Sequence, residues 1–180
     1  PIYYERLIKK YGSNFSPAEF QVQGNITKIN PIHFERILGF RKWHGYSTLI
    51  TSTWRKGMSG YHPLGLATDQ VLFDKWLEYP LSAAHHWNLA NAWGFPGIGL
   101  YFDWEFGSKS GNKEKTPGLH LDNGLERNRP LRWLCKEWPV KTDEGYQIKQ
   151  FYYYQDFKTG EFYNNERDES VTLDYALNNW

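Results

Sequence analysis

Apolar residues in the first quarter of the chain recur at the spacing of helices. Residues 16–20 place a serine, a proline and a glutamate in the order of a capping box, which predicts a short helix. A second helix is predicted between the Asn-Pro pair at positions 30 and 31 and the glycine at position 45. Its residues Phe34, Ile37 and Leu38 fall on one face, which we expect to pack on the core.

After residue 46 the pattern changes to strands with one intervening helix. The Ala and Leu content of residues 80–93, followed by glycine, predicts that helix. Residues 105–116 are rich in Gly, Ser and Lys, which predicts a solvated loop that is long enough to be a lid or an insertion. Runs of β-branched and apolar residues predict strands over residues 47–54, 67–73, 97–102 and 118–122.

The end of the chain has a different pattern. Residues 147–155 and 161–163 flank a Lys-Thr-Gly turn and predict a β-hairpin. The 180 residues are enough for one domain with a substantial core. We therefore expect one domain over residues 1–135 and an aromatic-rich extension over residues 136–180, packed on it or beside it.

Charged residues are nearly balanced, with 21 Lys and Arg against 20 Asp and Glu. This balance excludes the strong positive field of a nucleic-acid-binding protein, so we expect no nucleic-acid partner. Aromatic residues make up 18% of the chain and supply most of its large apolar surface. They also suit a groove that binds sugar or peptide.

The remaining features of the composition concern redox state and location. The single cysteine, Cys135, cannot form an internal disulfide and is expected to be a buried apolar residue. No run approaches the ~20 apolar residues of a membrane span. Residues 1–10 lack the apolar core of a signal peptide, so we expect a soluble protein. Pro1 is compatible with removal of either an initiator Met or a leader.

Three residues form a candidate metal site. His62 and Asp69 lie seven positions apart, across a glycine turn that leads into a predicted strand. Such a turn can bring both side chains to one point, where zinc would accept mixed nitrogen and oxygen ligands. His120 on a later strand supplies a third donor, and three protein ligands with one open position are typical of catalytic zinc. By composition alone, however, any one of the six histidines is more often a core or surface residue.

Several motifs in chain order carry a resemblance to a known family. The pattern HxxGxAxD from His62 to Asp69 is followed by HxD from His120 to Asp122. Residues 14–20, 29–44, 49–55, 97–101 and 132–133 match further segments of the same family in the same order. Over roughly residues 13–134, the chain resembles the zinc D-alanyl-D-alanine carboxypeptidases and peptidoglycan endopeptidases, which share their fold with the hedgehog signalling domain.

The resemblance implies a fold class and a set of site residues. It implies an α+β domain with a central, mostly antiparallel sheet flanked by helices, to which the C-terminal hairpin is added. It implies that His62, Asp69 and His120 bind Zn²⁺ and that Arg55 faces a carboxylate or carbonyl oxygen of the substrate. Without the resemblance, Arg55 is a surface charge at a strand end. Tyr101 is a candidate for the wall of a substrate groove, although an aromatic residue beside a glycine turn is more often part of the core.

The chain also departs from the family pattern. Pro117 stands where many relatives have the acidic general base, three residues before the last ligand. Asp122 is the leading candidate to orient a ligand or move a proton, because it lies two residues beyond His120 on the same strand face. Glu114 is a weaker candidate. Gly60 also replaces a serine that relatives have two residues before the first ligand.

Two main hypotheses about function remain open. The first is a zinc peptidase that hydrolyses an amide bond in D-alanine-containing stem or cross-bridge peptides of peptidoglycan, as a bacterial or phage-delivered wall-lytic enzyme. The second is a non-catalytic binding or structural protein, such as a phage virion component, that retains the peptidase fold. A hedgehog-like signalling module is a third, less favoured interpretation. The sequence does not distinguish a carboxypeptidase from an endopeptidase.

Overall fold

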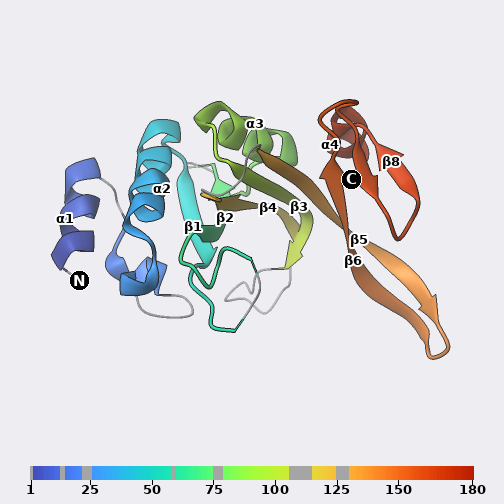
Figure 1. Cartoon of the computed structure of the whole chain (residues 1–180), viewed down its shortest axis with the longest axis horizontal. Helices are drawn as coiled ribbons and strands as arrows, with labels where there is room; N and C mark the ends of the chain where they lie inside the picture. The colour runs from blue at the N-terminus through green and yellow to red at the C-terminus, as the bar shows by residue number, and fades with distance from the viewer. Residues whose placement is uncertain are drawn as a thin grey trace.

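The chain folds around one large sheet, seen in Figure 1 in a computed structural model. The sheet is mixed, contains eight strands in the order β1-β2-β4-β3-β5-β6-β7-β8, and is accompanied by four α-helices among the described residues. The structure describes residues 2–12, 15–21, 26–57, 60–74, 79–105, 115–124 and 130–180.

Six neighbouring strand pairs are antiparallel, and only β3 and β5 are parallel among the described strands. The strands are β1 (Ser47–Ser52), β2 (Ala67–Phe73), β3 (Gly97–Glu105), β4 (Lys115–Asp122), β5 (Leu131–Thr142), β6 (Gly145–Gln155), β7 (Phe162–Asn164) and β8 (Glu169–Val171). The helices are α1 (Ile2–Tyr11), α2 (Pro31–His44), α3 (Ala83–Trp93) and α4 (Leu173–Asn179), with 3-10 turns η1 (Pro17–Phe20) and η2 (Ile26–Lys28).

Capping residues fix the ends of the two longest helices, and for α2 both were predicted. The Asn30 side chain accepts a hydrogen bond from the backbone N–H of Ile32 at 2.9 Å, and Gly45 ends α2 with φ 75°. Ser82 caps α3 in the same way, so this helix begins three residues later than expected. The shift arises because Pro80 still forms a β-bridge with Phe73.

Most of the strands follow the sequence pattern. The prediction for β2 is confirmed residue for residue, and the predicted hairpin corresponds to β6 and β7. The expected loop over residues 105–116 is shorter than predicted, because Glu105 ends β3 and Lys115 and Thr116 begin β4. The rest of that loop lies outside the described residues. Helices α1 and α4 and strands β5 and β8 had no sequence prediction.

Helix α3 packs on β3 and β4 on the face of the sheet opposite the candidate site, and α1 packs on α2. Alternate residues such as Ile98, Leu100 and Leu134 point into the helix-covered core and are fully buried. Trp180, after α4, packs against Phe102 and Tyr153 on the same face. A continuous aromatic and aliphatic core therefore reaches from α1 to the C-terminus.

The sheet passes without interruption from the first part of the chain into the C-terminal segment. Strand β5 begins within the expected domain and ends within the expected extension, and Figure 1 shows it crossing between the two parts. The division between residues 135 and 136 stays a prediction. Cys135 is buried and unpaired as expected, and burial raises the pKa of its thiol to about 12.

Helix length also bears on membrane association. None of the helices in the described ranges combines the length and hydrophobicity needed to cross a bilayer.

One buried histidine joins α3 to the sheet and gives a test of the fold. His86 Nε2 accepts the backbone N–H of Leu72 at 2.9 Å, and its Nδ1 donates to the carbonyl of Ser82 at 3.0 Å. Burial lowers the pKa of His86 to about 4, so the ring is neutral at pH 7.

We predict that His86→Leu destabilises the protein by about 1–3 kcal/mol, because it leaves a buried N–H of β2 without an acceptor. Urea denaturation at pH 7 measures the loss, with the exposed Asn88→Ala on the same helix as the control. Equal midpoints for the two variants would contradict this role.

Candidate metal centre

The candidate ligands meet on the face of the sheet opposite α3. Asp69 on β2 and His120 on β4 are directly opposite each other in the antiparallel pair. His62 reaches the same point from the turn that precedes β2. One donor atom from each residue lies within 4.8 Å of the others, so the three residues could hold a metal ion. The predicted convergence of these side chains is confirmed.

One oxygen of Asp69 is shared by the two imidazole rings. Asp69 Oδ1 lies 3.2 Å from His62 Nε2 and 2.8 Å from His120 Nδ1. All three residues have little contact with solvent, and only 2% of the surface of Asp69 is exposed. A buried carboxylate between two nitrogens is a strong attractor for a cation, whether this is a proton or a metal ion.

Further contacts fix the orientation of both rings. His62 Nδ1 lies 2.6 Å from the carbonyl oxygen of Thr53, which can only accept a hydrogen bond. Nδ1 therefore carries the proton, and the lone pair of neutral His62 is on Nε2, facing Asp69. His120 Nε2 lies 3.3 Å from Asp122 Oδ2. Such contacts to a carbonyl and a carboxylate are the usual supports of metal-binding histidines.

The hydrogen bonds between the two rings and their acceptor oxygens shift the pKa values of His120 and Asp69. Burial lowers the pKa of His120, but hydrogen bonds to Asp122 and Asp69 outweigh burial and raise the pKa to about 9. For Asp69, burial raises the pKa, but the bonds with His120 and His62 dominate and hold the pKa below its ordinary value. At neutral pH, a proton on His120 thus occupies the place that a metal ion could take.

Arg55 completes the surroundings of Asp69. Its Nη2 donates to Asp69 Oδ2 at 3.1 Å, on the carboxylate oxygen that the histidines do not use. The Arg55 side chain is 28% exposed and lines a cleft, so part of the guanidinium faces outward. It both orients the carboxylate and presents donors to a molecule in the cleft.

Two glycines on β3 make room for the site. A Cβ at Gly97 would lie 2.0 Å from Asp122 Oδ2, and a Cβ at Gly99 would lie 2.0 Å from the Trp133 ring. Both distances are too short for any side chain. The Gly-x-Gly pattern therefore lets Asp122 reach His120 and lets Trp133 pack against the same imidazole, with ring centroids 5.6 Å apart.

A cleft of about 670 Å³ opens beside Asp69 and Arg55. Burial raises the pKa of Tyr101, and nearby Asp69 raises it further, so its phenol stays protonated and can donate a hydrogen bond. Further lining residues come from β6 and from the part of β5 that lies in the expected extension. The cleft is lined by Arg55, Asp69, Tyr101, Trp104, Glu105, Lys115, Glu137, Ile148, Gln150 and Tyr152.

The structure brings Arg55, Tyr101 and Asp122 into the region of the three candidate ligands. Arg55 and Tyr101 line the cleft, and Asp122 lies against His120 with 1% of its surface exposed. Glu114 lies outside the described residues. Sequence reasoning missed the contribution of β5 and β6 to the cleft, since only the parallel pairing of β3 with β5 places these strands there.

Comparisons with known proteins leave the family unassigned. No protein-family model, no curated protein and no solved structure gives a significant match to this chain.

The raised pKa of His120 generates a prediction about metal binding. At pH 7 His120 carries a proton that a metal ion must displace, so binding of Zn²⁺ should release about one proton from this residue. The number released should fall as the pH rises through about 9, where the metal-free ring is already neutral. Calorimetry in two buffers of different ionisation enthalpy measures it. His85→Ala, which changes an exposed histidine, should leave the count unchanged; a count near zero for wild type at pH 7 would contradict the assignment.

Proposed function

We propose that this protein is a zinc-dependent peptidase that hydrolyses an amide bond in D-alanine-containing peptides of peptidoglycan. The observation that carries the proposal is the convergence of His62, Asp69 and His120 beside an open cleft. Two imidazoles and one carboxylate form a mixed nitrogen and oxygen donor set, which suits Zn²⁺. The motif resemblance to the zinc D-alanyl-D-alanine peptidases supplies the substrate class.

The donor set fits the metal in its electrostatics as well as its chemistry. Every ring nitrogen of His62 and His120 faces an acceptor oxygen, so a cation is needed between the rings and Asp69. The chemistry that zinc supplies when bound is Lewis acidity, which makes water nucleophilic near neutral pH and polarises a carbonyl. Asp122 acts here as a positioning residue, because it is buried and contacts His120 at Nε2, the ring nitrogen that faces away from Asp69.

The remaining groups bind and orient the substrate. The Arg55 guanidinium donates to a terminal carboxylate or to the oxyanion that develops on the attacked carbonyl. Tyr101 supplies a protonated hydroxyl in the same cleft. The general base is unassigned, since Pro117 occupies the position expected for it, and Glu105 and Glu137 are the additional carboxylates that line the cleft.

Digestion of purified peptidoglycan tests the proposal. We predict that zinc-loaded protein releases D-alanine or peptide fragments, and that chelator or His120→Ala abolishes release because the third donor is lost. Mass analysis of the fragments also distinguishes a carboxypeptidase from an endopeptidase. His85→Ala serves as the control for the loss of a histidine. Stoichiometric zinc without any release would favour the alternative, a non-catalytic protein that keeps the site.

A second prediction concerns Arg55. We expect Arg55→Lys to lower kcat/KM at least about tenfold while zinc content stays the same, since lysine keeps the charge beside Asp69 but loses the forked donors. Steady-state kinetics on a peptide ending in D-alanyl-D-alanine measures the effect. Lys56→Ala changes an exposed neighbouring cation and should have wild-type kinetics. Unchanged kcat/KM in Arg55→Lys would remove Arg55 from the mechanism.

A further inference from the structure

A single row of residues crosses the whole sheet on the face of the candidate metal centre. Each strand contributes one residue, and each residue is the direct neighbour of the next in the strand pairing. In sheet order the row is Ser52, Asp69, His120, Gly99, Trp133, Tyr154, Tyr163 and Ser170. Because neighbours in register point to the same side of a sheet, the two metal-ligand candidates of this row share a face with the tyrosines of the C-terminal segment.

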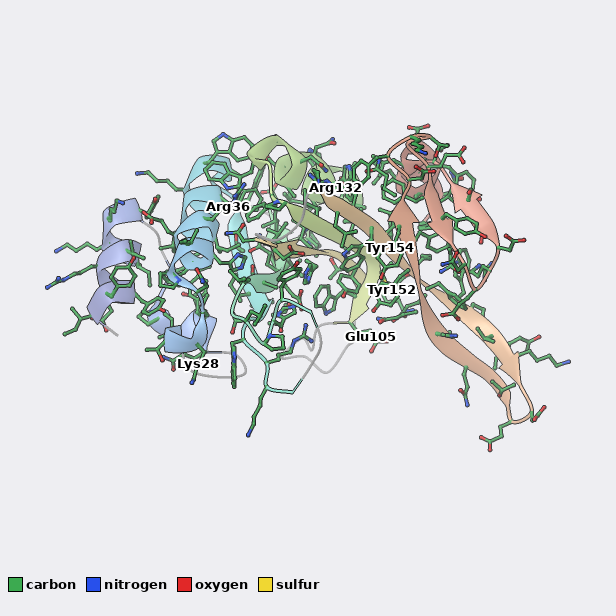
Figure 2. The ribbon with its side chains drawn as sticks, in the orientation of Figure 1. Lys28, Arg36, Glu105, Arg132, Tyr152 and Tyr154 are labelled. Carbon is green, nitrogen blue, oxygen red and sulfur yellow. The ribbon has the colours of Figure 1, made fainter. Side chains whose placement is uncertain are left out.

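Aromatic contacts extend from the metal centre to β6. The Trp133 ring lies against His120 and occupies the space that Gly99 leaves open. It also contacts Tyr152, with ring centroids 5.5 Å apart. Tyr152 lines the cleft beside Asp69, and Tyr154, two residues further along β6, lines a second hollow. Figure 2 labels both tyrosines on β6, where the sheet passes into the C-terminal segment.

The second hollow has a volume of about 490 Å³ and is built entirely from the C-terminal segment. Tyr154 and Tyr163 form its aromatic floor and are 50% and 38% exposed. The Tyr163 hydroxyl donates to Asp168 Oδ1 at 2.7 Å, which holds that ring in place. The lining residues are Tyr154, Gln155, Asp156, Thr159, Glu161, Tyr163, Asn165 and Ser170.

The chemistry of this hollow matches a neutral sugar. Tyrosine offers a flat apolar ring for the C–H face of a pyranose, and its hydroxyl remains polar. The side chains of Gln155, Asn165 and Ser170 supply both donors and acceptors, as the hydroxyl and acetamido groups of a sugar require. The only charged side chains among the lining residues are the acidic Asp156 and Glu161, which disfavours an anionic polymer.

We infer that the hollow on β6, β7 and β8 is a carbohydrate-binding subsite that takes a neutral N-acetylated glycan, with sugar rings stacked on Tyr154 and Tyr163. The link to catalysis rests on the proposed function. Five strand spacings of about 4.8 Å separate Asp69 from Tyr163 along the row, roughly 24 Å in all. A glycan chain held on the tyrosines would thus present its attached peptide to the cleft.

Titration of the 180-residue chain with a β-1,4-linked N-acetylglucosamine tetrasaccharide tests the subsite. We predict that Tyr154→Ala and Tyr163→Ala each weaken binding at least tenfold, because each removes one stacking surface. Tyr154→Phe keeps the ring and should bind within a few-fold of wild type. Tyr175→Ala, which removes an equally exposed tyrosine from α4, is the matched control and should bind as wild type does. Thermal unfolding checks that every variant is folded.

The same titrations in the His120→Ala background separate this inference from the proposed function, because that variant lacks a metal ligand but keeps the hollow. Saccharide binding in this background, with no hydrolysis by the wild type, would retain the subsite and remove the peptidase. Hydrolysis of free peptide by a wild type that does not bind the tetrasaccharide would overturn the subsite alone. An unchanged affinity of Tyr154→Ala for the tetrasaccharide would also overturn the subsite. A free stem peptide is titrated against the same variants. If Tyr154→Ala and Tyr163→Ala lose binding of the peptide but keep binding of the tetrasaccharide, the hollow is a peptide site.

Discussion

The Asp69 carboxylate is the constraint on which this structure depends. It lies within the sheet with almost no solvent contact, and its two oxygens are divided between two imidazoles on one side and a guanidinium on the other. A charge buried in this way is tolerated only when it is paired and hydrogen-bonded. The positions of His62, His120 and Arg55, and the supports that hold the two rings, all follow from the need to satisfy one carboxylate.

Several of the elements could be predicted from the sequence because their signals are local. Asn30 and Gly45 mark the ends of α2, and the apolar run of β2 is bounded by turns, so short-range rules suffice. Asp69 and His120 are 51 positions apart in the chain and lie on different strands. Their pairing was predicted from the motif resemblance and not from a physical argument. The contact of His62 with the Thr53 carbonyl could not be predicted, because every residue has a backbone carbonyl and the sequence does not show which one is used.

The contribution of the C-terminal segment could not be predicted for a topological reason. Strand β5 lies parallel to β3, with β4 on the other side of β3, and nothing in the period of residues 131–142 indicates which edge they join. Once that pairing is made, β6 follows as a hairpin and brings Tyr152 and Gln150 to the cleft. The segment that the sequence predicts to be an extension therefore lines the candidate site.

The parallel pairing of β3 with β5 also imposes an order on folding. All three donor residues precede β5 in the chain, so their strands can pair while the later residues are still being synthesised. Trp133 can cover His120 only after β5, which follows the donor residues in the chain, has been synthesised and has joined β3. If β2 and β4 pair before β5 arrives, the three ligands are assembled while the Trp133 side of His120 is still open to water, and a metal ion could bind at that stage.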